Sequence, residues 1–284
     1  MSDLAYLAPG RTAVITGAAD GIGRAAALRF AALGLNVVLA DRNAQGLAAT
    51  EEAVKATARE GAAAISVTMD VSDFHQVCAL KTEAFERFGD VAVLMNNAGV
   101  GGGGSAFENR EGWMRILSVN LIGVLNGVQA FTAEMIGQGR PATIINTGSK
   151  QGITTPPGDT AYNVSKAGVK VLTEGLAHTL RNTPACQVSA HLLVPGFTFT
   201  GLTRPGEREK PAGAWSAEQV IDFALERMAA GDFYIICPDN EVTRHMDNAR
   251  MEWAAQDISH NRPPLSRWHP EWKDAFADFL AKRT

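Results

Sequence analysis

The chain has 284 residues, 46% of them hydrophobic and 20% charged, with a formal net charge of −4. This composition supports a large core and excludes a chain that is disordered throughout, and the charge excludes the basic surface used to bind nucleic acid or an anionic membrane. No apolar run approaches the ~18 residues of a membrane-spanning helix, and no basic segment of a secretory signal begins the sequence, so we expect a cytoplasmic protein.

Short β-branched runs alternate with Ala-, Leu- and Glu-rich stretches of helical length through the first two-thirds of the chain. The predicted strands cover 12–16, 36–40, 64–69, 91–95, 143–146 and 188–194, and the predicted helices cover 21–33, 44–60, 73–88, 111–136 and 160–182. Continuous apolar strands separated by helices are typical of a parallel sheet covered on both faces. The pattern predicts a single doubly wound α/β domain with about seven strands.

The pattern is looser after position 195. A loop rich in Gly, Pro and charge covers 196–215, and a helix at 216–230 and a last strand at 233–237 follow. We therefore assign 1–240, including this loop, to the domain. The remaining tail, 241–284, contains Trp253, Trp268 and Trp272, which are unlikely to remain in water, so we expect it to pack on the domain or on a neighbouring subunit.

A glycine-rich turn joins the first predicted strand to the first helix. Glycines let the backbone approach a pyrophosphate closely, and the free N–H groups of a helix N-terminus favour its charge. A turn that binds no ligand is the alternative, but the strand before it and the helix after it favour binding. The candidate cofactor contacts here are Thr16, Gly17, Asp20, Gly21, Ile22 and Gly23.

The end of the second predicted strand carries signals for both forms of a nicotinamide cofactor. Asp41 can accept hydrogen bonds from a ribose 2′-hydroxyl, whereas Arg42 would bind a 2′-phosphate. Asp20 would add a second negative charge near the same pocket, and like charges repel a phosphate. We therefore favour NAD(H), with NADP(H) as the alternative.

Tyr162 and Lys166 lie four residues apart on a predicted helix and so share one face. An ammonium near a phenol stabilises the phenolate and lowers the phenol pKa toward neutrality. Ser149, at the end of a predicted strand, carries a hydroxyl that could hold a carbonyl oxygen. These three residues are the candidate catalytic groups.

Together these motifs resemble the short-chain dehydrogenase/reductase family, over about residues 10–240. The matching residues, in family order and spacing, are Thr16, Gly17, Gly21, Gly23, Asp70, Val71, Asn96, Asn97, Ala98, Gly99, Asn120, Ser149, Tyr162, Lys166, Pro195 and Gly196. The resemblance implies a Rossmann-like domain and an NAD(P)-dependent oxidoreductase that interconverts a secondary alcohol and a ketone. It also implies a homodimer or homotetramer in which the helices bearing Asn120 and Tyr162 pack between subunits.

The resemblance implies a role for each catalytic residue. Tyr162 would be the general acid or base, Ser149 would hold the reacting oxygen and orient substrate, and Lys166 would hold the nicotinamide ribose and lower the Tyr162 pKa. Asn120 would anchor a water in a proton relay. The further implied cofactor contacts are Asp70, Val71, Asn97, Ala98, Gly99, Pro195, Gly196, Thr198 and Thr200.

Each assignment has a plainer alternative. Asn120 could be a helix-interior polar residue that bonds to backbone, and Asp70 could cap the helix that follows Ser72. Asn96 and Asn97 could form a turn, and Ser149 could be a simple strand-end residue. The histidines and the three cysteines show no ligand spacing, so we expect no metal site.

Two features depart from the family pattern. Thr198 stands where a β-branched apolar residue is common, but a backbone contact to the cofactor survives that change. Four consecutive glycines, 101–104, follow the Asn-Ala-Gly segment and indicate either a roomy pocket or a plain flexible loop.

The substrate is less readable than the cofactor. The candidate substrate contacts besides Ser149 are Ile153, Phe197, Phe199 and Leu202, and no cationic pair stands out for a carboxylate or phosphate. We therefore expect a neutral, hydrophobic, aryl or polycyclic small molecule. The alternatives are a 3-oxoacyl-thioester reductase of fatty-acid type and a non-catalytic cofactor-binding protein.

Overall fold

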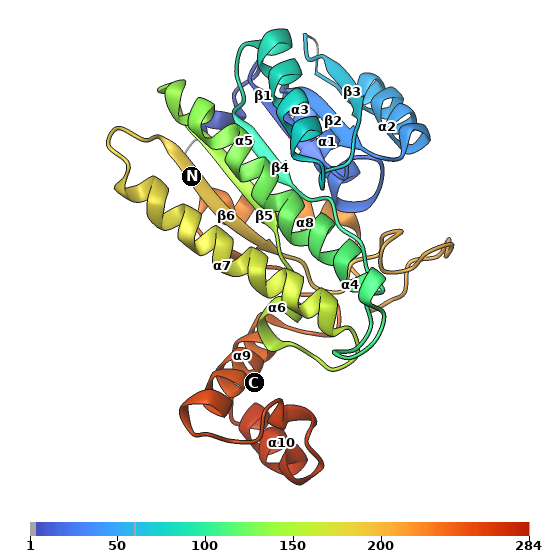
Figure 1. The fold of residues 1–284 in the computed structure, drawn as a ribbon, viewed down its shortest axis with the longest axis vertical. Coiled ribbons are helices and arrows are strands. Elements are labelled where there is room, and N and C mark those ends of the chain that lie inside the picture. Colours follow the sequence, from blue (N-terminus) through green and yellow to red (C-terminus); the bar gives the residue numbers. More distant parts are fainter. Residues whose placement is uncertain (1–3, 60, 284) are drawn as a thin grey trace.

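The strands form one parallel sheet in the computed structural model, which describes residues 4–59 and 61–283 (Figure 1). In the described part of the chain the sheet has seven strands in the order β3-β2-β1-β4-β5-β6-β7. Their bounds are β1 Thr12–Thr16, β2 Asn36–Asp41, β3 Ala64–Thr68, β4 Val93–Asn96, β5 Ala142–Thr147, β6 Val188–Val194 and β7 Tyr234–Ile236. The order reverses between β1 and β4, so the carboxyl ends of these neighbouring strands open a crevice.

Helices cover both faces of the sheet. Three helices contribute buried residues to the core on each face. They are α1 Gly21–Ala32, α2 Ala44–Thr57 and α8 Ala217–Ala229 on one side, and α3 Phe74–Phe88, α5 Gly123–Gly137 and α7 Thr160–Asn182 on the other. Phe30 of α1 and Phe131 of α5 are among the largest fully buried side chains, one on each face. The predicted doubly wound, Rossmann-like fold is confirmed.

The predicted helix at 111–136 is continuous but changes its winding. It comprises α4 Arg110–Ile116, a π-helical segment η2 Leu117–Ile122, and α5. By length and composition the stretch Arg110–Gly137 could cross a membrane, and half of its most apolar window is buried. Phe131 and Met135 face the sheet in the second core cluster, as expected of a core helix in a globular protein.

The remaining elements are one short helix before β1, one short helix after β5, and the helices of the tail. They are η1 Ala5–Leu7, α6 Gln151–Thr154, α9 Arg244–Ser259, η3 Ser266–Trp268, η4 Pro270–Trp272 and α10 Lys273–Ala281. The short helix α6 follows β5 and packs along α7.

The tail contacts the domain through α9 and otherwise packs on itself (Figure 1). Met251 of α9 joins a core cluster with β6 and α7, whereas Trp253 lies at the centre of an aromatic group with Trp272, Phe276 and Phe279. The tail aromatics thus bury one another more than they cover the domain. Packing of the tail against a neighbouring subunit stays a prediction.

Candidate active site

A cleft of about 1130 Å³ lies at the carboxyl ends of the strands, where the strand order reverses. Its walls come from the glycine turn after β1, the ends of β2, β4, β5 and β6, the start of α7 and the loop 196–205. Most of the predicted site residues line it. Thr16, Gly23, Asn120, Ile153 and Phe199 are not among the lining residues.

At its glycine positions the turn after β1 has no room for a side chain. Gly17 adopts a φ of 69°, and a Cβ at Gly23 would lie 2.1 Å from the carbonyl oxygen of Gly17. The exposed backbone at this helix N-terminus therefore forms a concave surface that a Cβ would fill, which fits the close approach of a pyrophosphate.

Thr16 and Asn97 brace this turn. The Thr16 hydroxyl accepts hydrogen bonds from the backbone N–H groups of Asn97 and Ala98, at 2.9 and 3.2 Å. The Asn97 amide donates in return to the carbonyl oxygen of Thr16, at 3.1 Å. Thr16 therefore supports the cleft from behind, by joining the ends of β1 and β4.

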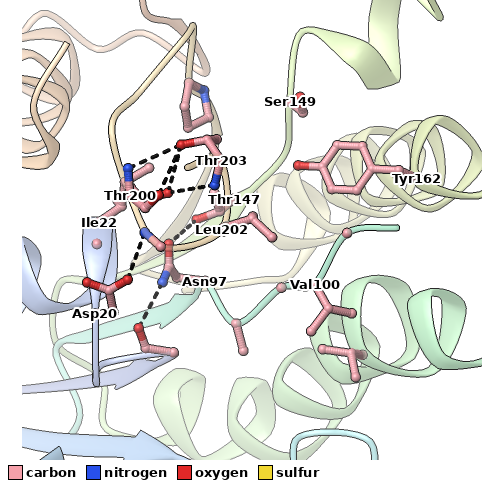
Figure 2. Close-up of a pocket in the computed structure, with 18 of the residues that line it drawn as sticks. Asp20, Ile22, Asn97, Val100, Thr147, Ser149, Tyr162, Thr200, Leu202 and Thr203 are labelled. Carbon is pink, nitrogen blue, oxygen red and sulfur yellow. Dashed lines mark hydrogen bonds between the residues drawn. The ribbon is translucent and has the colours of Figure 1, made fainter. Parts of the chain in front are cut away.

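The two acidic residues that were expected to share the adenosine pocket have separate partners. The Asp41 carboxylate accepts from the backbone N–H groups of Ala19 and Asn43, at 3.1 and 2.9 Å. The Asp20 carboxylate instead accepts from the N–H of Gly201, at 2.9 Å, and so joins the glycine turn to the loop after β6 (Figure 2). Both carboxylates line the cleft, Asp41 at the end of β2 and Asp20 beside the loop after β6, and Arg42 next to Asp41 is exposed.

Asp70 does not cap α3, which corrects the alternative considered for it. Its carboxylate accepts from the N–H and hydroxyl of Ser72, at 2.9 and 2.7 Å, while Asp73 is the N-cap of α3. Val71 is buried against Gly123, with its carbonyl oxygen accepting from Asn126. Both Asp70 and Val71 line the cleft.

Tyr162 and Ser149 face each other across the cleft floor, with the phenol pointing into the cleft (Figure 2). Burial raises the pKa of Tyr162, a hydrogen bond with Ser149 lowers it, and the nearby charge of Asp159 raises it, with a net increase. This direction is opposite to the sequence-based expectation. Lys166 does not offset the burial of the phenol, because its ammonium is directed to a different oxygen.

That oxygen is the backbone carbonyl of Thr147, to which Lys166 Nζ donates at 2.8 Å. Lys166 Nζ lies 5.7 Å from the centroid of the Tyr162 ring. The side chain is buried, and this burial lowers the pKa of Lys166 to about 8. The ammonium is thus held next to the phenol but without direct contact with its hydroxyl.

Asn120 is completely buried in the π-helical segment, and its side chain bonds to the backbone of Val100 and to Ser165. Its side-chain oxygen accepts from the N–H of Val100 at 2.8 Å, and its amide donates to the carbonyl oxygen of Val100 at 2.9 Å and to Ser165 at 3.3 Å. The structure therefore shows the plainer reading, a helix-interior polar residue that bonds to backbone. Its role in a proton relay stays a prediction.

The loop after β6 supplies part of the predicted set. Pro195, Gly196, Phe197, Thr198, Thr200 and Leu202 line the cleft. Phe199 is not among the lining residues, and neither is Ile153, which packs on the core cluster that includes Val169 of α7. Their contact with substrate stays a prediction, because apolar character alone does not tell which side of a loop or short helix faces inward.

The glycine loop 101–104 is tethered rather than open. Gly102 and Gly104 have φ values of 81° and 85°, and Gly103 is buried against α7. The carboxylate of Asp159 accepts from the N–H groups of Gly102 and Gly103. Hydrogen bonds thus hold the loop at two positions, while Gly101 and Gly102 still line the cleft without side chains, and a roomy pocket stays a prediction.

Sequence reasoning missed Asp159 and Arg115 as cleft-lining residues, and it missed the structural partners of Lys150. Asp159 could have been found, since an Asp at the start of a predicted helix is a typical N-cap. Arg115 Nη2 donates to the carbonyl oxygen of Gly101 at 2.9 Å, and Lys150 pairs with Asp239 and Asp247. These two contacts join distant segments and leave no local pattern. In the described residues, no group of three or more His, Cys, Asp or Glu could hold a metal ion.

Comparisons with known proteins agree with this geometry. A 1-deoxy-11-beta-hydroxypentalenate dehydrogenase of Streptomyces exfoliatus is 33% identical over 91% of this chain and 94% of its own. A 3-oxoacyl-[acyl-carrier-protein] reductase of Staphylococcus aureus is 33% identical over 68% of this chain and 76% of its own. The crystal structure of a short chain dehydrogenase/reductase from Burkholderia phymatum in complex with NAD is 36% identical, covers 90% of this chain and 96% of that chain, and superposes with a TM-score of 0.80.

Residues 11–211 match the family described as short chain dehydrogenase, which is more than half of the chain. The chain belongs to the short-chain dehydrogenase/reductase family.

Proposed function

We propose that the protein is an NAD(H)-dependent oxidoreductase that interconverts a secondary alcohol and a ketone on a hydrophobic, polycyclic or aryl small molecule. The observation that carries this proposal is the placement of Tyr162, Ser149 and Lys166 on one side of a cleft whose other side is the glycine turn. The similarity to a hydroxypentalenate dehydrogenase along nearly the whole chain supports it.

The residues present fit a dinucleotide. Gly17, Gly21 and Ile22 would hold the pyrophosphate, and Asp41 would accept from the adenosine ribose. A bound nicotinamide would exchange a hydride with the carbinol carbon. The protein positions the substrate and moves the proton: Ser149 holds the reacting oxygen, and Tyr162 takes the hydroxyl proton during oxidation or donates it during ketone reduction.

The acyl-thioester alternative fits less well. The acyl-carrier-protein reductase aligns over 68% of the chain, whereas the hydroxypentalenate dehydrogenase aligns over 91%. Asp41 also disfavours the 2′-phosphate of NADPH, because its carboxylate lies at the end of β2 with no cation paired to it among the described contacts.

The first test is fluorescence titration of the protein with NADH and NADPH in parallel, followed by oxidation assays on polycyclic secondary alcohols. We expect tighter binding of NADH and NAD-dependent turnover. Tyr162→Phe should retain NADH binding and lose turnover by about 10²- to 10⁴-fold, the usual contribution of general acid–base catalysis. Tighter NADPH binding would reverse the cofactor assignment, and turnover unaffected by Tyr162→Phe would remove Tyr162 from the chemistry.

We also propose a cytoplasmic homodimer or homotetramer that buries the outer faces of the helices bearing Asn120 and Tyr162. Ile122, Val164 and Val171 are exposed on these helices, and Val164 and Val171 lie seven residues apart on one face. Light scattering would show whether Val171→Asp dissociates the assembly, and a monomeric parent protein would refute this proposal.

A further inference from the structure

Asp159 lies three residues before Tyr162 and caps the helix that carries it. Its Oδ1 accepts from the backbone N–H of Tyr162 at 3.1 Å. Its Oδ2 accepts from the N–H groups of Gly102 and Gly103, at 3.0 and 3.1 Å. One carboxylate therefore satisfies donors of two segments separated by more than fifty residues.

The glycine loop lies directly on the first turn of α7. A Cβ at Gly103 would lie 2.4 Å from Cβ of Ala161 and 2.7 Å from Cδ1 of Ile116. The N–H of Ala161 also donates to the carbonyl oxygen of Gly104, at 3.4 Å. The loop and the helix start are therefore in contact on both sides of the Asp159 carboxylate.

Both segments belong to the cleft. Gly101, Gly102, Asp159 and Tyr162 all line it, on the substrate side of the cofactor-binding turn. A shift of the glycine loop would change the wall against which a substrate rests, and a shift of the first turn of α7 would move the phenol. Because both depend on the same carboxylate, wall and phenol would shift together.

We propose that Asp159 is a positioning residue that fixes the glycine loop 101–104 against the start of α7 and thereby sets the distance between the substrate wall and the Tyr162 phenol. The inference rests on the proposed function only for its effect on turnover. Gly101 and Gly102 present only backbone to the cleft along this wall.

The charge of Asp159 gives a readout that a simple helix cap lacks. Burial is the largest cause that raises the pKa of Tyr162, and Asp159 raises it further. Lys166 Nζ lies 5.7 Å from the centroid of the phenol ring, and the cleft is also lined by Arg115 of α4 and by Lys150, which is paired with two carboxylates. Removal of the Asp159 charge therefore lowers the pKa of Tyr162.

The decisive variant is Asp159→Ser, because serine caps a helix but is too short to reach the glycine loop as well. Asp73→Ser is the matched control: Asp73 caps α3 by accepting from His75 and Gln76, at 2.9 and 3.3 Å, and is not among the residues that line the cleft. Asp159→Asn, which keeps the shape and removes the charge, serves if the serine variant does not fold.

Amide hydrogen exchange of the unliganded protein tests the tether without any substrate. We expect exchange at Gly102 and Gly103 to accelerate about 10- to 100-fold in Asp159→Ser, as for the loss of hydrogen bonds to a charged acceptor, and to stay unchanged in Asp73→Ser. Unchanged exchange at both glycines in Asp159→Ser would overturn the inference, whether or not any alcohol is oxidised.

The pH profile of kcat/KM tests the link to Tyr162 once a substrate is known. We expect Asp159→Ser and Asp159→Asn to raise KM for bulky alcohols and to move the inflection to lower pH, with the Asp73→Ser profile unmoved. An inflection that stays in place while activity falls would reduce Asp159 to a helix cap and refute its positioning of the phenol.

Discussion

We expect a single carboxylate to set the preference for NADH over NADPH. Asp41 and Asp20 have the same charge, but Asp41 accepts from backbone at the end of β2 while Asp20 joins the loop after β6. We expect Asp41→Asn to narrow the preference for NADH over NADPH by about tenfold, since one charge near a phosphate is worth roughly 1.4 kcal/mol. Asp20→Asn should leave the ratio unchanged. Parallel titrations measure both, and a ratio that moves in Asp20→Asn alone would reassign the pocket.

The pH dependence of catalysis is also set by single groups around the phenol. In the proposed mechanism Tyr162 is the base in oxidation, and its raised pKa leaves little phenolate at neutral pH, so we expect oxidation to speed up as pH increases and ketone reduction to slow. Ser149→Ala removes the hydrogen bond that lowers the pKa of Tyr162, and should therefore shift the oxidation profile to higher pH. We also expect a loss of about 10²- to 10³-fold in kcat, as for the removal of one oxyanion donor. A profile shifted to lower pH would contradict this role of Ser149.

Among the secondary-structure elements, the glycine loop 101–104 packs against both α4 and α7. Gly103→Ala would place a methyl group 2.4 Å from Cβ of Ala161, which requires the loop or the start of α7 to move. We expect KM to rise and the variant to lose about 1–3 kcal/mol of unfolding free energy, as for an overpacked core. Gly101→Ala is the control, because its nearest neighbour would be Leu202 at 3.6 Å. Denaturant unfolding and steady-state kinetics give both quantities, and equal effects of the two substitutions would argue against a packed loop.

The elements that could be predicted are those governed by local pattern. The strands at 12–16 and 188–194 and the helix at 160–182 match the structure end to end, because buried parallel strands read as continuous apolar runs and the helix starts at an Asp cap. The π-helical turn at Leu117–Ile122 could not be predicted, since it depends on how Asn120 meets the distant backbone of Val100. The partners of Asp20 were missed for the same reason.

At the scale of the whole molecule, one lysine joins the tail to the active site. Lys150 follows Ser149 and lies 3.4 Å from Asp239 and 2.6 Å from Asp247 of α9. Asp239 also accepts from the N–H of Phe197, near the start of the loop 196–215. The segment after β5, the loop 196–215 and α9 of the tail therefore meet at the Lys150 ammonium. The side chains of its two carboxylate partners are only 5% and 6% exposed.

The pKa values of the two carboxyl groups are shifted in opposite directions. Burial opposes ionisation of Asp239, but the N–H of Phe197 and the charge of Lys150 outweigh it and lower its pKa. Burial raises the pKa of Asp247, and Lys150 offsets this only in part. Without Lys150 the folded-state pKa of both carboxyls rises. A carboxyl with a raised folded-state pKa contributes stability that is present below its unfolded pKa and is lost as pH rises through the folded value.

Lys150→Met should therefore be more harmful at neutral than at acidic pH. At pH 7 Asp239 would lose its paired cation and Asp247 would keep only its longer contact with Arg250, at 4.0 Å, so we expect a loss of about 3–5 kcal/mol in unfolding free energy. Near pH 4 to 5 the carboxyls of the variant bind more protons than those of the parent, because their pKa values are higher without Lys150, so the deficit shrinks in the direction required by linkage. Urea unfolding at the two pH values measures the difference. Lys55→Met, which breaks an exposed pair with Glu51, should cost less than about 0.5 kcal/mol at either pH. A loss of unfolding free energy in Lys150→Met that is equal at both pH values would mean that the ionisation of Asp239 and Asp247 does not depend on Lys150.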